Sequence, residues 1–131
     1  MREHITFGFI GIGLIGGSVA KALRRVYPSC KIIVYNRSAE PRVMAINDGT
    51  ANVAVPQVDK TFNECDYIFL CTPVEKNVEY LKILKDIIKD DCIITDVGSV
   101  KGNIHKAVEE LGLEKNFIGG HPMAGSEKTS Y

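Results

Sequence analysis

Apolar positions follow two alternating patterns along this chain. Short, continuous apolar runs, rich in β-branched and aromatic residues, are separated by segments in which apolar residues recur every three or four positions. The first pattern is typical of buried strands and the second of amphipathic helices. Strands are predicted at residues 5–10, 31–35, 53–55, 66–71, 92–97 and 116–119. Helices are predicted at residues 14–26, 40–48, 78–88 and 100–111.

The continuous apolar character of the strands indicates the type of sheet. Strands that are buried on both faces lack polar–apolar alternation, as expected in a parallel sheet covered by helices on each side. The repeated strand–helix order therefore predicts an α/β fold, a Rossmann-type doubly wound parallel sheet in three α/β/α layers. No linker or repeat interrupts the pattern, so residues 1–131 are predicted to form one domain. Ligands of such folds bind beyond the carboxyl ends of the strands.

Composition and charge narrow the classes of partner. The 131 residues include 16 Lys or Arg and 16 Asp or Glu, and this balance argues against nucleic acid as a partner. No apolar run approaches the roughly 18 residues of a membrane span, and the first residues lack the pattern of a secretory signal. Cys30, Cys65, Cys71 and Cys92 form no C-x-x-C pair. Neither a disulfide framework nor a metal site is expected, and a cytoplasmic location is predicted.

A glycine-rich loop follows the first predicted strand and opens the first helix. Gly11, Gly13 and Gly16 have the G-x-G-x-x-G spacing of dinucleotide-binding proteins. In that motif the first glycine permits a tight turn, the second lets a pyrophosphate approach the backbone, and the third lets the helix pack against the sheet. Leu14 and Ile15 begin the helix, whose free N–H groups would face the phosphates. The alternative is a glycine-rich turn without a ligand.

The end of the second predicted strand bears on the choice of dinucleotide. NAD sites usually carry Asp or Glu there, which accepts hydrogen bonds from the ribose 2′-hydroxyl. This chain has Asn36, Arg37 and Ser38 instead. Asn36 does not repel a 2′-phosphate, Arg37 offers a bidentate fork and Ser38 a hydroxyl donor. NADP is therefore the predicted cofactor, with NAD as the second possibility. The alternative for Arg37 is a solvated surface arginine.

The loops after the later strands carry further candidates. Thr72 and Pro73 either cover the cofactor or only terminate their strand. Ser99 either caps the following helix or contacts a ligand, and Asp96 before it is interpreted as buried and structural. His121 lies between Gly-Gly and Pro after the last strand. Histidine is the side chain whose unperturbed pKa lies near 6.5, which suits proton abstraction at neutral pH; the alternative is a purely structural histidine.

Three short segments carry a more specific pattern. They read GIGLIGGS at residues 11–18, DVGSVK at 96–101 and GGHPMAGSE at 119–127. In this order they resemble the nucleotide-binding domain of the prephenate dehydrogenases and the closely related arogenate dehydrogenases. The resemblance implies that prephenate is oxidised by hydride transfer to the nicotinamide and loses its ring carboxylate as CO2. The product is 4-hydroxyphenylpyruvate, in tyrosine biosynthesis.

The same resemblance implies roles for four residues of the last two segments. His121 is similar to the base that accepts the proton of the substrate 4-hydroxyl, and Ser99 to the residue that hydrogen-bonds that hydroxyl and the histidine. Ser126 and Glu127 are similar to residues that line the substrate pocket. Removal of a proton as hydride departs is general-base catalysis, which contributes about 10²–10⁴-fold to a rate.

Members of the family carry a second, helical domain after this one, which forms the dimer and supplies basic groups for the substrate carboxylates. The 131-residue chain is therefore expected to bind dinucleotide but to be catalytically incomplete alone, and a homodimer is expected only where that domain is present. Three alternatives stay open: an arogenate dehydrogenase, another β-hydroxyacid-type dehydrogenase, and a non-catalytic dinucleotide-binding module.

Overall fold

The structure, a computed structural model, describes residues 4–97 and 104–119 and confirms the doubly wound α/β fold. Six strands form one sheet in the order β3-β2-β1-β4-β5-β6, and each pairing is parallel. The strands are β1 (Thr6–Ile10), β2 (Lys31–Tyr35), β3 (Val53–Val55), β4 (Tyr67–Leu70), β5 (Ile93–Asp96) and β6 (Phe117–Ile118). The helices are α1 (Leu14–Val26), α2 (Ala39–Asn47), the 3-10 helix η1 (Lys60–Glu64), α3 (Val74–Leu84) and α4 (Ile104–Glu110).

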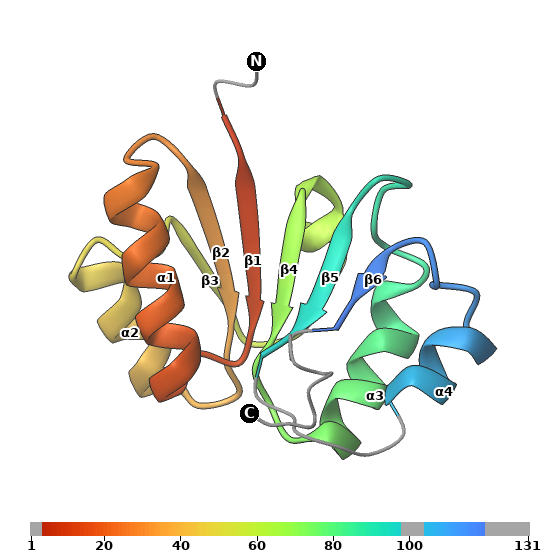
Figure 1. The fold of residues 1–131 in the computed structure, drawn as a ribbon. Coiled ribbons are helices and arrows are strands. Elements are labelled where there is room, and N and C mark those ends of the chain that lie inside the picture. The colour runs from red at the N-terminus through yellow and green to blue at the C-terminus, as the bar shows by residue number, and fades with distance from the viewer. Residues whose placement is uncertain (1–3, 98–103, 120–131) are drawn as a thin grey trace, which may run out of the picture.

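Two hydrophobic cores lie on opposite faces of the sheet. In β2, Ile32 and Val34 pack into the core beneath α1 and α2, whereas Ile33 and Tyr35 pack into the core beneath α3 and α4. Figure 1 shows α1 and α2 together beside β2 and β3, and α3 and α4 together beside β5 and β6. Because successive side chains of a strand point to opposite faces, burial on both faces requires the continuous apolar runs of the sequence.

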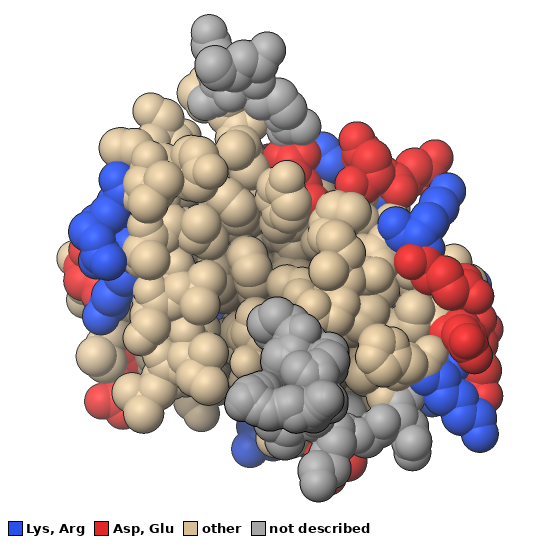
Figure 2. All heavy atoms as spheres, in the orientation of Figure 1, with Lys and Arg blue, Asp and Glu red and all other residues tan. Residues whose placement is uncertain are grey.

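Within residues 4–97 and 104–119, the face that carries α1 and α2 is covered over only part of the sheet. Tyr67 of β4 is 42% exposed and Ile118 of β6 is 58% exposed, and no helix of the described chain packs over them. Figure 2 shows the middle of this side of the molecule as an uncharged surface, with acidic and basic side chains toward its margins. None of the helices among residues 4–97 and 104–119 has the length and hydropathy to cross a membrane.

Two segments differ from the predicted elements. The helix predicted over residues 78–88 starts earlier, at Val74, and ends at Leu84. The backbone N–H groups of Ile87 and Ile88 both bond to the Leu84 carbonyl, so a turn brings these side chains to the core without further helix. The 3-10 helix η1 was not predicted. Its start is fixed by the Asp59 side chain, which accepts a hydrogen bond from the next-but-one backbone N–H.

Candidate functional site

The winding of the chain reverses between β1 and β4. From β1 the chain builds outward through β2 and β3 by way of α1 and α2, and it then crosses to β4 and builds outward in the other direction. The carboxyl ends of β1 and β4 are therefore neighbours, while the connections that leave them pass to opposite faces (Figure 1). A crevice at such a reversal is where doubly wound folds bind their ligands.

The glycine loop has three different environments at its three glycines. Gly11 has φ +91°, a conformation that L side chains rarely adopt, and its N–H donates to the Tyr35 carbonyl at 2.8 Å. A Cβ at Gly11 would lie 2.6 Å from Thr72 Cγ2, and one at Gly16 would lie 3.0 Å from the Gly11 carbonyl oxygen. A Cβ at Gly13 would meet nothing within 4 Å. The fold itself therefore requires Gly11 and Gly16, whereas Gly13 leaves open space beside the helix.

The first turn of α1 presents backbone N–H groups for which residues 4–97 and 104–119 provide no acceptor. Gly13 is the residue before the helix and provides no capping side chain, and the first turn contains no acidic residue. The N–H groups of the first turn have no intrahelical acceptor, and the helix dipole adds a partial positive charge. The side chain of Leu14 is 93% exposed and that of Ile15 is more than half exposed, so neither folds back over these groups. Such a terminus suits a phosphate.

The Asn36 side chain links the glycine loop to the loop after β2. Its Oδ1 accepts the N–H of Ile12 at 3.1 Å, and its Nδ2 donates to the Ser38 carbonyl at 3.3 Å. Ser38 precedes α2, but its side chain makes no capping hydrogen bond, so its hydroxyl is not used to cap the helix. The side chain of Arg37 is exposed beside it. The three residues predicted to read the 2′-position therefore occur together at the carboxyl end of β2.

Arg42 was not singled out from the sequence. Its Nη1 donates to the carbonyl oxygens of Asn36 at 2.7 Å and Arg37 at 3.0 Å. One guanidinium therefore fixes the backbone of the loop that carries Arg37 and brings a second positive charge to it. The sequence pattern did not mark Arg42 as a candidate, because it lies inside the second predicted helix, where an arginine is usually solvated.

Tyr80 of α3 meets Tyr35 at the end of β2. The two hydroxyl oxygens are 2.7 Å apart, and the rings pack edge to face with centroids 5.2 Å apart. Burial, together with the hydrogen bond to Tyr35, raises the pKa of the Tyr80 hydroxyl to about 12, and the positive charge of Arg37 opposes this shift. The pair thus ties the end of β2 to the helix that follows β4.

The residues after β4 form a second polar contact at the crevice. Pro73 directly precedes α3, and the Thr72 hydroxyl donates to Oδ1 of Asn77 on that helix. The Asn77 side chain is fully buried. Burial, helped by the nearby Asp96 carboxylate, raises the pKa of the thiol of Cys71, the residue before Thr72, to about 12.

The carboxyl end of β5 leads to the catalytic candidates. Asp96 ends that strand and is 3% exposed, which agrees with its interpretation as a buried residue. Ser99, His121, Ser126 and Glu127 lie outside the described residues, and their roles stay predictions. In the described segments, no group of three or more His, Cys, Asp or Glu side chains is arranged to hold a metal ion.

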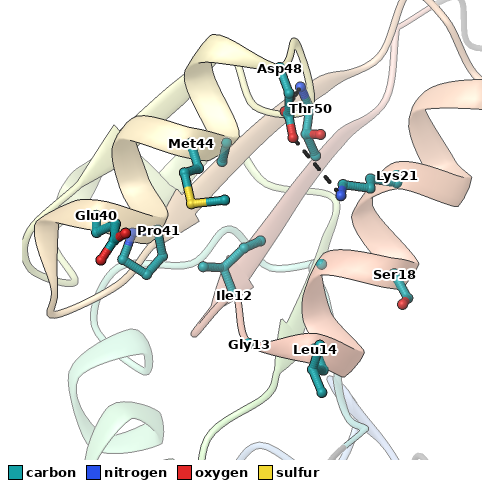
Figure 3. A pocket seen from close by; sticks show the side chains of 12 residues that line it. Ile12, Gly13, Leu14, Ser18, Lys21, Glu40, Pro41, Met44, Asp48 and Thr50 are labelled. Atoms are coloured by element: carbon teal, nitrogen blue, oxygen red, sulfur yellow. Dashed lines mark hydrogen bonds and ion pairs between the residues drawn. The ribbon is translucent and has the colours of Figure 1, made fainter.

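A pocket of about 430 Å³ lies between α1 and α2, next to the glycine loop. Figure 3 shows Ile12, Pro41 and Met44 turned into the space between the helices, and Leu14 lines the pocket at the start of α1. An ion pair between Lys21 Nζ and Asp48 Oδ2, 4.0 Å apart, lies at one end. The lining of this pocket is mainly apolar, which suits a ring or sugar face better than a phosphate.

Comparison with known proteins agrees with this geometry. The sequence model of the "prephenate dehydrogenase, nucleotide-binding domain" family matches residues 19–130. The chain is 38% identical over 123 residues to the prephenate dehydrogenase of Lactococcus lactis subsp. cremoris, covering 92% of this chain and 34% of that protein. It thus spans about a third of the length of this curated relative.

Two solved structures are similar to the chain throughout the sheet. The Aquifex aeolicus prephenate dehydrogenase, solved in complex with hydroxyphenyl propionate and NAD+, superposes with a TM-score of 0.81 at 36% identity, over 95% of this chain and 43% of that one. The Synechocystis arogenate dehydrogenase superposes with a TM-score of 0.76 at 30% identity, over 88% of this chain and 40% of that one.

Proposed function

This chain belongs to the prephenate dehydrogenase family, and from that membership we propose that it is the coenzyme-binding part of an enzyme that converts prephenate to 4-hydroxyphenylpyruvate. The observation that carries the proposal is the glycine loop. It has a turn that only glycine adopts readily, a helix N-terminus without a capping side chain in the described part of the chain, and open space at Gly13 where a side chain would block a pyrophosphate. Motif and geometry agree at the place where the fold binds nucleotides.

A nicotinamide dinucleotide held by these residues would supply the hydride acceptor for oxidation of the substrate carbon. In the proposed division of labour, the first-turn N–H groups of α1 bind the pyrophosphate and Gly13 admits it close to the backbone. By family resemblance, His121 accepts the proton of the 4-hydroxyl and Ser99 orients that hydroxyl. Ser126 and Glu127 line the substrate pocket. Loss of CO2 makes the ring aromatic, so the protein mainly has to align the reacting carbon.

NADP is the dinucleotide we propose for this chain. Arg37, the Ser38 hydroxyl, which does not cap α2, and the Arg42 guanidinium lie at the loop where a 2′-phosphate would bind, and Asn36 carries no charge to repel it. Calorimetric titration of the chain with NADP and NAD tests the preference. Arg37→Ala should weaken NADP binding by about ten- to a hundredfold, as expected for a hydrogen bond to a charged group, and leave NAD binding unchanged. Equal affinities for the two dinucleotides in the unaltered chain would refute a 2′-phosphate site.

The proposed activity is tested in the enzyme by following the absorbance of reduced nicotinamide with prephenate as substrate. His121→Asn should lower turnover by about two orders of magnitude with little effect on NADP binding, because it removes the base and not the coenzyme site. Wild-type turnover in that variant would refute the assignment of the base. Arogenate is the second candidate substrate, favoured by the similarity to the Synechocystis enzyme. The ratio of kcat/KM for the two substrates decides between them.

A further inference from the structure

We propose that Asn77 is a positioning residue of the coenzyme site, where it holds the Thr72 hydroxyl so that its oxygen accepts a hydrogen bond from a sugar hydroxyl of the dinucleotide. The proposal rests on the proposed function, because it assumes that a nicotinamide dinucleotide occupies the crevice. It adds a residue that neither the sequence motifs nor the family resemblance picked out.

Asn77 occupies a position where the fold otherwise uses apolar side chains. Asn77, Leu81 and Leu84 recur at helical spacing on the same side of α3, and all three are fully buried. The two leucines belong to the core beneath α3 and α4. Asn77 is the member of this row nearest the start of the helix, and therefore nearest the carboxyl end of β4 and the glycine loop.

The hydrogen bonding of Asn77 is incomplete within the described chain. Its Oδ1 accepts a hydrogen bond from the Thr72 hydroxyl, but its Nδ2 is buried without a hydrogen-bond partner in residues 4–97 and 104–119. A buried, unsatisfied polar group costs about 1–3 kcal/mol of stability. A leucine in this place would avoid that cost, so the stability of the fold does not explain the asparagine.

The Thr72–Asn77 bond decides what Thr72 can do next. A threonine hydroxyl has one proton to donate and lone pairs to accept with. Because the Thr72 hydroxyl already donates its hydrogen bond to Asn77 Oδ1, the Thr72 oxygen can act only as an acceptor toward any further partner. Phosphate oxygens are acceptors as well, so Thr72 is not suited to the pyrophosphate. The sugar hydroxyls of a dinucleotide are donors, and they match it.

The position of Thr72 indicates which of the two sugars of the dinucleotide would donate the hydrogen bond. Its methyl group packs against Gly11, since a Cβ there would lie 2.6 Å from it, so the hydroxyl is beside the glycine turn on the β4 side. The adenosine end is proposed to lie on the β2 side, at Asn36 and Arg37. A pyrophosphate at the turn then separates the two ends, and the sugar next to Thr72 is the one attached to the nicotinamide.

Two variants and one control test this assignment. Asn77→Leu removes the acceptor for the Thr72 proton, and Thr72→Val removes the hydroxyl while keeping the side-chain shape. Asn63→Leu is the control, because it makes the same substitution on η1, where the Asn63 Nδ2 donates to the Ile87 carbonyl at 2.7 Å. Each protein is titrated with NADP and with 2′-phospho-ADP, which lacks the nicotinamide-side sugar, and its Tm is measured.

Asn77→Leu and Thr72→Val should each weaken NADP binding by about three- to tenfold, the value of one hydrogen bond, and leave 2′-phospho-ADP binding unchanged. The double variant should lose no more than either single variant, because both act on one interaction. Asn77→Leu should keep or raise the Tm. The Asn63→Leu control should leave both affinities unchanged.

Several outcomes would overturn the proposal. A lower Tm with unchanged NADP affinity in Asn77→Leu would show that Asn77 is purely structural. An equal loss of affinity for NADP and 2′-phospho-ADP would show that Thr72 does not contact the nicotinamide-side sugar. If Asn77→Leu fails to fold, unchanged NADP affinity in Thr72→Val decides against the proposal. If the unaltered chain bound none of the three ligands, NADP, 2′-phospho-ADP and NAD, the proposed function itself would be refuted.

Discussion

Gly11 and Gly13 belong to one motif, but we expect alanine to lower mainly the stability at Gly11 and mainly the affinity for NADP at Gly13. Alanine at Gly11 must adopt φ +91°, which costs about 1–3 kcal/mol for a residue with a Cβ. Its Cβ would also lie 2.6 Å from Thr72 Cγ2, and overpacking of this kind costs a further 1–3 kcal/mol or so. The total, about 2–6 kcal/mol, is a large part of the stability of a domain.

Alanine at Gly13 meets no such obstacle in the folded chain. Its φ is −47°, and no heavy atom lies within 4 Å of the added Cβ. Since alanine is a poorer residue than glycine before a helix, the variant should lose at most about 1 kcal/mol of stability. The same Cβ would occupy the space that we assign to the pyrophosphate. The Kd for NADP should therefore rise at least about tenfold, which corresponds to about 1.4 kcal/mol.

Urea denaturation followed by far-ultraviolet circular dichroism measures the first effect, and the absence of tryptophan makes calorimetry the suitable method for the second. Gly11→Ala should shift the denaturation midpoint strongly, and Gly13→Ala should shift mainly the NADP titration. A Gly11→Ala protein within about 1 kcal/mol of the unaltered chain would refute the strain argument. NADP affinity in Gly13→Ala within twofold or so of the unaltered chain would refute the placement of the pyrophosphate.

Three further predictions concern other contacts. Tyr35→Phe and Tyr80→Phe should each lower the free energy of unfolding by about 0.5–1.5 kcal/mol, and the double variant should lose less than the sum, as read from urea denaturation. The free energy of unfolding should fall as pH rises from about 9 to about 12, because burial raises the pKa of the Cys71 and Cys92 thiols to about 12, while in the unfolded chain they ionise near 9.0. Denaturation at about pH 8, 10 and 11 measures this, and a stability that rises over that range would contradict it. Arg42→Ala should weaken NADP binding more than NAD binding in calorimetric titration, because it releases the two loop carbonyls and removes a positive charge; an equal loss for both would assign Arg42 a purely structural part.

The elements that the sequence predicted well are those whose pattern depends on burial alone. β2 has the predicted bounds, because a strand covered on both faces must be apolar throughout. β3, a half-buried strand at the edge of the sheet, has the predicted bounds as well. The glycine loop was also predictable, since steric limits on backbone and Cβ restrict such positions to glycine. Gly112, with φ +72°, lies at the predicted end of the last helix for the same reason.

The contacts that the sequence did not reveal join residues from different elements. Tyr80 meets Tyr35 across 45 positions, and neither residue carries a local pattern that pairs it with the other. Asn77 lies in a row of buried helix positions, and a prediction from apolar periodicity does not mark a polar residue there as buried. Periodicity predicts which side of a helix is buried, but not which polar side chain in that row reaches the crevice.

The central place of β1 has a consequence for the order of folding. β1 pairs with β4 as well as with β2, and Phe7 is matched with Tyr67, a separation of 60 positions. At about 5–20 residues per second, ribosomal synthesis delivers that partner several seconds after β1 has emerged. The entropy of closing a long loop is lost before the paired strands gain their contacts, and this slows the folding of parallel sheets. The glycine turn is therefore completed late, because Gly11 gains its packing partner only when Thr72 arrives.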